Sequence, residues 1–231
     1  MRRIFLGLVV CLASALGLAA TQAPQSAVPR DATVAHTAAG GSTPLDAYLD
    51  DMKTLRATFV QTLADAHGQE VDHATGTLIV SRPGKFSWEI HPQGSAAGAG
   101  QLMVSDGRNL WFLDRDLQQV TVKPVDAALS ATPAMLLSGT VDVRRNFTIT
   151  REGARDGLEW VLVEPHGSQA DFRRARLGFA GKELKRMLLD DKLGQTATIV
   201  FDHVERNGPV APQEVSFTLP PGVDVIGTAA K

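Results

Sequence analysis

The sequence predicts a mainly β protein, an antiparallel meander that is either open or closed into a barrel, with short helical insertions. Apolar residues alternate with period two in short segments along most of the chain. The 21 glycines and 12 prolines favour frequent turns over long helices, and each candidate strand is one short connection from the next. The 231 residues, 44% of them hydrophobic, suit one large domain or two small ones and argue against wholesale disorder.

The chain begins with the pattern of a secretory signal peptide, predicted over residues 1–20. Arg2 and Arg3 supply a basic start, and Ile4–Leu18 is an apolar run. This run is shorter than the roughly 20 residues of a membrane span, so an uncleaved anchor is the less favoured alternative. The single cysteine, Cys11, lies within the run, so the mature protein is expected to lack disulfides.

The segment after the signal peptide, residues 21–43, is rich in Ala, Thr, Pro, Gly and Ser and shows no apolar period. This composition predicts a flexible leader, because such a segment cannot bury enough apolar surface to offset its ordering entropy. The folded domain is predicted over residues 44–228. No later stretch reaches transmembrane length, so we expect an exported protein.

A short helix is predicted at the start of the domain. The segment Thr43–Asp46 combines an N-cap threonine, a proline in the first turn and the spacing of a capping box. Leu45, Leu49 and Met52 then fall on one helical face. From Leu55 the apolar period changes to two, which predicts a strand.

The remainder of the domain is predicted to be strands and turns. Ser105–Arg108 predicts a hairpin, because Asp-Gly tolerates the positive φ of a type I′ turn. Residues 124–146 break the meander, and we expect one or two short apolar helices there, with Pro133 as a helix starter. The predicted strands are 55–63, 71–80, 85–90, 101–105, 109–113, 118–123, 146–151, 158–164, 173–179, 184–190, 195–206 and 214–218.

Signatures of catalysis are missing from the sequence. It has no Gly-x-Ser-x-Gly elbow and no Walker loop, so we expect neither an enzyme nor a cofactor. The net charge of −2 and the pI near 6.3 provide no basic field for nucleic acid. His67, Glu70 and His73 have ligand chemistry for a metal, but a solvated hairpin loop is the favoured interpretation, so no metal site is predicted.

Two segments stand out from this background. If alternation holds from residue 82 to 90, Arg82 shares the apolar face with Phe86, Trp88 and Ile90 and needs partners there. Alternatively, Arg82 lies at the strand end and reaches water. The second segment, Thr132–Gly139, is either a core helix or a movable lid over a ligand cavity, and its own sequence favours the core helix.

The order and spacing of several motifs resemble the LolA family, the periplasmic outer-membrane lipoprotein carriers. The resemblance covers about residues 45–226. Its marks are Phe59-Val60-Gln61, Gly76-Thr77-Leu78, Arg82-Pro83-Gly84-Lys85-Phe86-Ser87-Trp88, Val104 to Trp111, Gln118-Gln119-Val120, Pro133-Ala134-Met135-Leu136-Leu137, Asp190 to Gln195, Phe217, and Pro220 to Asp224.

This resemblance implies an unclosed antiparallel β-barrel of about eleven strands with a helical lid. It implies a monomeric carrier that acts in the periplasm and binds no nucleic acid. Such a carrier would take triacylated lipoproteins from an inner-membrane ABC transporter of the LolCDE type to an outer-membrane acceptor of the LolB type. In the family, the arginine that matches Arg82 bonds lid-backbone carbonyls and holds the empty cavity closed; the matching lid is Pro133–Leu137.

Twelve apolar residues are candidates for contact with acyl chains, and ordinary core packing is the alternative for each. They are Phe59, Phe86, Trp88, Ile90, Leu102, Val104, Trp111, Leu113, Met135, Leu136, Met187 and Leu189. A Gly/Ala-rich insertion at residues 93–100 departs from the family pattern. Sheets of this shape also serve as envelope-stress regulators, so a sensor of periplasmic lipids or lipoproteins is the rival function.

Overall fold

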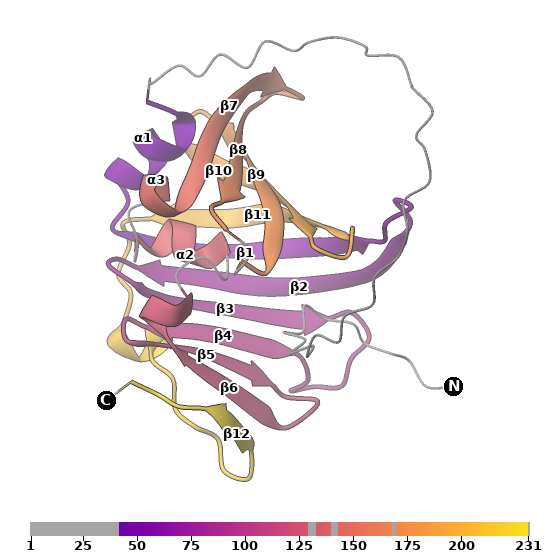
Figure 1. The fold of residues 1–231 in the computed structure, drawn as a ribbon, viewed down its shortest axis with the longest axis vertical. Helices are drawn as coiled ribbons and strands as arrows, with labels where there is room; N and C mark the ends of the chain where they lie inside the picture. The colour runs from indigo at the N-terminus through magenta and orange to yellow at the C-terminus, as the bar shows by residue number, and fades with distance from the viewer. Residues whose placement is uncertain (1–41, 129–132, 140–142, 168–169, 231) are drawn as a thin grey trace, which may run out of the picture. The chain divides into compact units, whose positions relative to one another are not determined.

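One curved sheet of twelve strands dominates the computed structural model, which describes residues 42–128, 133–139, 143–167 and 170–230 (Figure 1). The predicted signal peptide and all but the end of the predicted leader lie outside these residues. The strands lie in the order β12-β6-β5-β4-β3-β2-β1-β11-β10-β9-β8-β7. Their bounds are β1 (Thr54–Ala64), β2 (Glu70–Ser81), β3 (Lys85–Pro92), β4 (Gln101–Asp106), β5 (Asn109–Asp114), β6 (Gln119–Pro124), β7 (Phe147–Arg155), β8 (Leu158–Pro165), β9 (Phe172–Ala180), β10 (Glu183–Asp191), β11 (Thr196–Arg206) and β12 (Asp224–Gly227).

The sheet is unclosed and largely antiparallel, which confirms the predicted fold class. Only β12 runs parallel to its neighbour, β6. The sheet has twelve strands rather than about eleven. The predicted strand at 214–218 is wrong: Pro212–Val215 forms the 3-10 helix η2, and the additional strand lies further on at Asp224–Gly227.

Helices α1 and α2 begin where the sequence indicates. Helix α1 (Pro44–Asp50) is capped by Thr43, whose backbone N–H donates to Asp46 Oδ2 at 2.7 Å in the expected capping box. Between β6 and β7 lie the 3-10 helix η1 (Val125–Ala128), α2 (Pro133–Ser138) and α3 (Val143–Asn146). The predicted helical break at 124–146 is confirmed, and α2 begins at Pro133. Among the described residues, no helix is long and apolar enough to cross a membrane.

The predicted hairpin at Ser105–Arg108 is confirmed, but its turn is not type I′. Gly107 alone in this segment has a positive φ, 93°, whereas type I′ requires two such residues. The carboxylate of Asp106 stabilises the turn instead, accepting the backbone N–H groups of Arg108 and Asn109 at 2.8 Å each.

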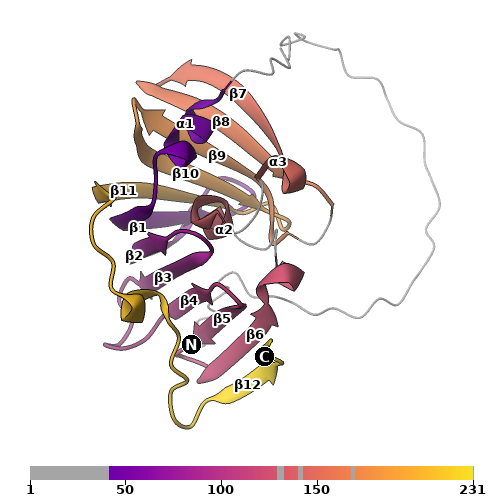
Figure 2. The same ribbon diagram turned by 90° about the vertical axis from the view of Figure 1, so that its left-hand side faces the viewer.

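The concave face of the sheet holds the main core. Across β2, β1 and β11, the aligned residues Gly76, Phe59 and Phe201 all lie on this face. Side chains of α1 and α2 join the same apolar cluster. Figure 2 shows α2 lying over the concave face of the sheet.

Gly76 is required for this packing. A Cβ at this position would overlap the backbone carbonyl of Glu89 on β3 and the ring of Phe59, whose Cε1 would lie 2.8 Å away. We therefore expect Gly76→Ala to lower the free energy of unfolding by about 1–3 kcal/mol, because overpacking forces a buried ring to move. Urea unfolding measures the loss; an unchanged midpoint would show that the Phe59 ring and the Glu89 carbonyl both move aside without cost.

The opposite, convex face is covered in part by the segment that follows β11. Phe217 stacks on Trp111 with ring centroids 4.9 Å apart, and Val215 is buried. Arg56 pairs with Glu214 at 2.7 Å. The apolar residues around 214–218 therefore cover the sheet rather than extend it.

A charged network on the convex face ties β9 to β10. Arg174 Nε donates to Asp190 Oδ2, and Thr196 Oγ1 donates to Asp190 Oδ1 at 2.8 Å. Burial alone would raise the pKa of Asp190, but these hydrogen bonds and the charge of the nearby Arg176 outweigh burial and hold the pKa below its ordinary value.

The lowered pKa means that ionised Asp190 stabilises the folded state above its unfolded pKa of about 3.9. This contribution is lost as pH falls through the lower folded value. We expect Asp190→Asn to reduce the free energy of unfolding at pH 7 by about 1–3 kcal/mol and to flatten its decline below about pH 4. Urea unfolding between pH 7 and pH 2.5 tests this; parallel curves for the two proteins would contradict it.

Candidate functional site

The concave face is an apolar floor covered at its centre by α2. Ala134, Met135, Leu136 and Leu137 of α2 are all fully buried. The helix packs on β2 and β3, where Leu78 and the residues facing it form the floor. In this structure α2 therefore occupies the hollow as a core helix, as its own sequence favours.

Burial falls along the strands towards one end of the sheet. On β1, Phe59 is buried, but Leu63 is partly exposed. On β3 the change comes between Trp88 and Ile90, and on β10 between Met187 and Leu189. Because Leu63 and Leu189 both align with Ala197 of β11, the exposed positions lie at the same end. We call the end marked by Leu63, Ile90 and Leu189 the open end.

At the other end of the floor, Arg82 lies in the turn between β2 and β3. Its Nη1 donates to the backbone carbonyls of Leu49 and, at 3.2 Å, Met52. Leu49 lies in the last turn of α1 and Met52 lies just after the helix, where the exposed carbonyls of a helix C-terminus favour a cation. Within the described residues, the guanidinium therefore bonds α1 and not the backbone of Pro133–Leu137, where the family resemblance places the lid.

Contacts with the same turn hold the end of α2. The backbone N–H of Gly84 donates to the carbonyl of Ser138 at 2.8 Å, and Ser105 Oγ donates to the carbonyl of Gly84 at 2.6 Å. Gly139 lies against Arg82, since a Cβ there would be 2.6 Å from Nη2, and its φ is +67°. Arg82 is thus bonded to α1 and in steric contact with the residue that ends α2.

A second clamp on α1 comes from the end of β11, which the sequence did not indicate. Arg206 Nη2 donates to the carbonyl of Tyr48 at 3.0 Å, and its guanidinium lies 4.6 Å over the Tyr48 ring. Asn207 Nδ2 donates to the carbonyl of Asp51 at 2.9 Å. Burial raises the pKa of Tyr48 to about 12. Arg206 and Asn207 donate hydrogen bonds to backbone carbonyls, and every residue has such a carbonyl, so no hydrophobic pattern in the sequence predicts these contacts.

The N-terminal end of α1 is joined to α3. Arg144 Nη2 lies 2.6 Å from Asp46 Oδ2, the carboxylate that also completes the capping box. Burial alone would raise the pKa of Asp46, but hydrogen bonds from Thr43 and Arg144 lower it. Helix α1 is therefore held at both ends by charged or amide side chains.

The structure brings together eight of the twelve candidate acyl-contact residues. Phe59, Phe86, Trp88, Met135, Leu136 and Met187 are buried in the concave core, and Ile90 and Leu189 pack against it. Whether they contact acyl chains stays a prediction. Met103 and Ile149 also pack against this core, although neither was among the twelve candidates. Met103 lies on a strand that is apolar on both faces, so the sequence did not show which face belongs to the core.

The other four candidates, Leu102, Val104, Trp111 and Leu113, lie on the convex face. Met103 aligns with Trp88 on the concave face, so its neighbours in β4 point the other way. Trp111 aligns with Val104 and stacks on Phe217. Alternation shows which residues share a face, but it does not tell which face is concave.

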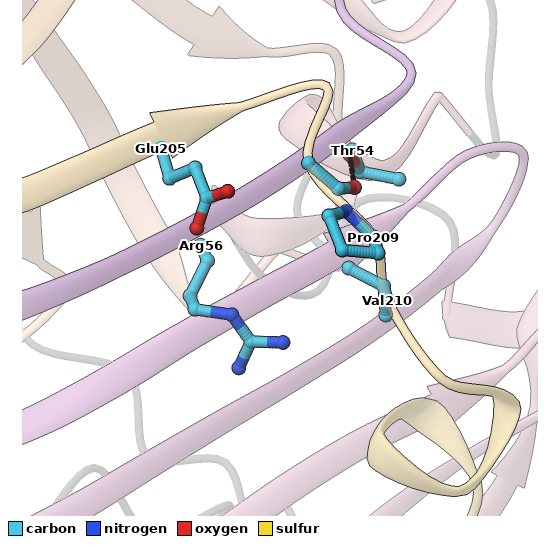
Figure 3. A pocket seen from close by; sticks show the side chains of 6 residues that line it. Thr54, Arg56, Glu205, Pro209 and Val210 are labelled. Atoms are coloured by element: carbon cyan, nitrogen blue, oxygen red, sulfur yellow. Dashed lines mark hydrogen bonds between the residues drawn. The ribbon is translucent and has the colours of Figure 1, made fainter.

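The site offers an apolar surface rather than reactive groups. Across the part of the chain that the structure describes, no three His, Cys, Asp or Glu side chains are placed to hold a metal ion. His73 Nε2 lies 3.6 Å from Glu70, while His67 faces Asp65 at 3.8 Å. A shallow pocket beside the end of β11, with Arg56 and Glu205 in its wall, is polar and lies on the convex face (Figure 3).

Comparison with known proteins gives consistent matches. The family model described as outer membrane lipoprotein carrier protein LolA matches residues 50–218, which include α2 and strands β1 to β11. A protein described as an outer-membrane lipoprotein carrier protein from Dechloromonas aromatica is 39% identical over 82% of this chain and 88% of its own. One of the same description from Cupriavidus necator is 33% identical over 95% of this chain and 97% of its own.

Proposed function

This chain belongs to the LolA family of outer-membrane lipoprotein carrier proteins, and we propose that it carries its cargo by holding lipoprotein acyl chains against the concave face of the sheet. The observation that supports this most is the apolar floor that is covered by α2 at its centre and exposed at the open end. As a carrier, the protein is a non-enzymatic transport protein.

The cargo explains why a carrier needs such a hollow. Each buried methylene is worth about 0.8 kcal/mol, so three acyl chains represent tens of kcal/mol that a free lipoprotein would lose on entering water. A protein that substitutes for the bilayer must cover these chains, yet it must also release them. Non-covalent affinities reach only about −18 to −21 kcal/mol, so partial coverage favours release.

Helix α2 competes with the acyl chains for the apolar floor, and this competition favours release of the cargo. Its buried Met135, Leu136 and Leu137 occupy apolar surface that acyl chains would need. In our proposal α2 and the acyl chains exclude each other, which makes the closed and loaded states a two-state equilibrium biased by cargo. The contacts of Gly84 and Arg82 at the end of α2 set how favourable the closed state is.

The donor and acceptor of the cargo follow from the family and belong to the proposal. We propose that the protein acts in the periplasm, receiving triacylated lipoproteins from an inner-membrane ABC transporter of the LolCDE type. An outer-membrane acceptor of the LolB type then receives them. Residues 1–20 would direct export and be removed, leaving residues 44–228 as the working domain after a short leader.

A displacement assay tests the function. The mature protein should bind a hydrophobic fluorescent probe at micromolar concentration, and a triacylated lipoprotein should displace it, whereas the same lipoprotein stripped of its acyl chains should not. Failure to bind the probe, or equal displacement by the stripped protein, would contradict acyl-chain binding. In cells, depletion should leave lipoproteins at the inner membrane; unchanged lipoprotein distribution with an altered stress response would favour the regulator instead.

A further inference from the structure

The protein has three tryptophans, and two of their indole N–H groups have a hydrogen-bond acceptor among the described residues. Trp111 Nε1 donates to Asp106 Oδ2 at 2.8 Å, and Trp160 Nε1 donates to the carbonyl of Arg155 at 3.0 Å. Trp88 Nε1 is buried and finds no acceptor among the described residues. Buried donors without partners are rare in proteins, because losing water without a replacement costs free energy, so this N–H needs an explanation.

Trp88 stands at the boundary between the covered and the exposed floor. It aligns with Leu78 and Met103, and its ring meets the edge of Phe59 at a centroid distance of 5.6 Å and an angle of 67°. Its residue is 7% exposed, whereas Ile90, two positions nearer the open end, is partly exposed. Because Nε1 is itself buried in the closed state, a ligand that enters from the open end would meet it once α2 has given way, as the proposed function requires.

The chemistry of the ligand decides what such a donor can do. A hydrocarbon chain has no hydrogen-bond acceptor, so it would leave the Trp88 N–H as it is in the unloaded protein. An acyl chain brings one acceptor into an apolar site, the carbonyl oxygen of the ester or amide that attaches it. In a site shielded from water, a hydrogen bond to that oxygen is stronger than in water.

We propose that the Trp88 indole N–H donates a hydrogen bond to an acyl carbonyl oxygen of the cargo, so that the site recognises acyl esters and amides and not only hydrocarbon. This inference rests on the proposed function and adds a polar contact to it. A phenylalanine at this position would supply the apolar surface, but it would lack the donor.

The hydroxyl of Tyr48 is also buried without a partner among the described residues, but its position suits this role less well. It is 1% exposed, it packs against Phe179, and Arg206 covers its ring. Its helix, α1, is clamped at both ends. Trp88 lies instead on the floor beneath α2, the element that gives way to cargo in our proposal.

Matched lipids test the proposal in the full mature protein. We would measure dissociation constants for a diacylglycerol and for the dialkylglycerol ether with the same number of chain atoms, which lacks the carbonyls. Wild type should bind the ester about five-fold more tightly than the ether. Trp88→Phe should abolish that preference by lowering the affinity for the ester alone. Trp111→Phe is the matched control: it makes the same change where the indole N–H already has an acceptor, and it should keep the preference.

Equal affinity of wild type for ester and ether, or a preference that survives in Trp88→Phe, would overturn the inference alone. Binding of neither lipid to wild type would overturn the proposed function and the inference with it. If Trp88→Phe does not fold, infrared spectroscopy of wild type with carbonyl-labelled diacylglycerol decides. A carbonyl stretch lowered below its value in hydrocarbon solvent supports the hydrogen bond, and an unshifted band overturns it.

Discussion

Replacing Arg82 by leucine should slow the release of bound lipoprotein by about 10- to 100-fold while the protein stays folded. Arg82 lies between the ends of α1 and α2: it donates to the carbonyls of Leu49 and Met52, and Gly139 packs against its guanidinium. Leucine removes these hydrogen bonds and the surface against which α2 ends. The closed state loses stability, but the loaded state, in which α2 is displaced, does not depend on that contact.

The size of the effect follows from the competition between α2 and cargo. Because α1 keeps its bonds to Arg82 in both states, only the contact of the guanidinium with the end of α2 distinguishes the closed state. Losing such a contact costs about 0.5–3 kcal/mol, and each 1.4 kcal/mol lost from the closed state tightens cargo binding ten-fold. Affinity changes of this kind occur mainly in the off-rate. Arg82→Lys should give an intermediate rate, because an ammonium donates from a single point and cannot reproduce the planar fork.

Stopped-flow displacement of a labelled lipoprotein measures the release rate. Arg115→Leu is a matched control, since Arg115 is a half-buried arginine that pairs with Glu89 at 2.6 Å on the convex face. It should leave the rate unchanged. If Arg82→Leu loses its cooperative unfolding transition, Arg82 is a structural arginine, and if the release rate equals that of wild type, the contact does not control the closed state.

Much of the fold could be predicted because local patterns match it. Alternation located the strands from β1 to β11, and Thr43 with Asp46 predicted the capped start of α1. Pro133 marked the start of α2. Each of these signals arises from interactions within a few residues or from the period of one element, so no knowledge of the tertiary arrangement was needed.

The parts that could not be predicted depend on distant contacts. Leu102 and Trp111 were predicted to contact acyl chains, but both lie on the convex face, where Phe217 stacks on Trp111. Alternation cannot reveal a cover from another part of the chain. The clamp of Arg206 and Asn207 on α1 joins residues more than 150 positions apart through backbone carbonyls. Any sequence offers such acceptors, so nothing marks the pair in advance.

These distant contacts suggest a division of labour between the helices. Helix α1 is held by Arg82, by Arg206 with Asn207, and at its other end by Arg144. Helix α2 buries four consecutive apolar residues, Ala134 to Leu137, completely. Burial is the interaction that acyl chains can replace, whereas they offer nothing in exchange for hydrogen bonds to helix carbonyls. We therefore expect cargo to displace α2 and to leave α1 in place.

This division predicts that a charge placed on α2 should open the site. Leu136 is fully buried in the closed state, and an unpaired carboxylate there would cost several kcal/mol. In Leu136→Asp, α2 should leave the floor. The affinity for a hydrophobic fluorescent probe should then rise at least ten-fold, because binding no longer has to spend free energy on displacing α2. The free energy of unfolding should fall by about 2–5 kcal/mol.

The same substitution at an exposed leucine separates opening from general damage. Leu193 is 71% exposed at the tip of the β10–β11 hairpin, so Leu193→Asp should change neither probe affinity nor stability. Met135→Ala shortens one buried side chain of α2 without adding a charge, so it should give a smaller rise in probe affinity than Leu136→Asp. If Leu136→Asp keeps the strand signal in circular dichroism but binds the probe no better than wild type, α2 does not compete for the apolar floor. If Met135→Ala unfolds cooperatively at wild-type denaturant concentration with unchanged probe affinity, burial is not what holds α2 closed.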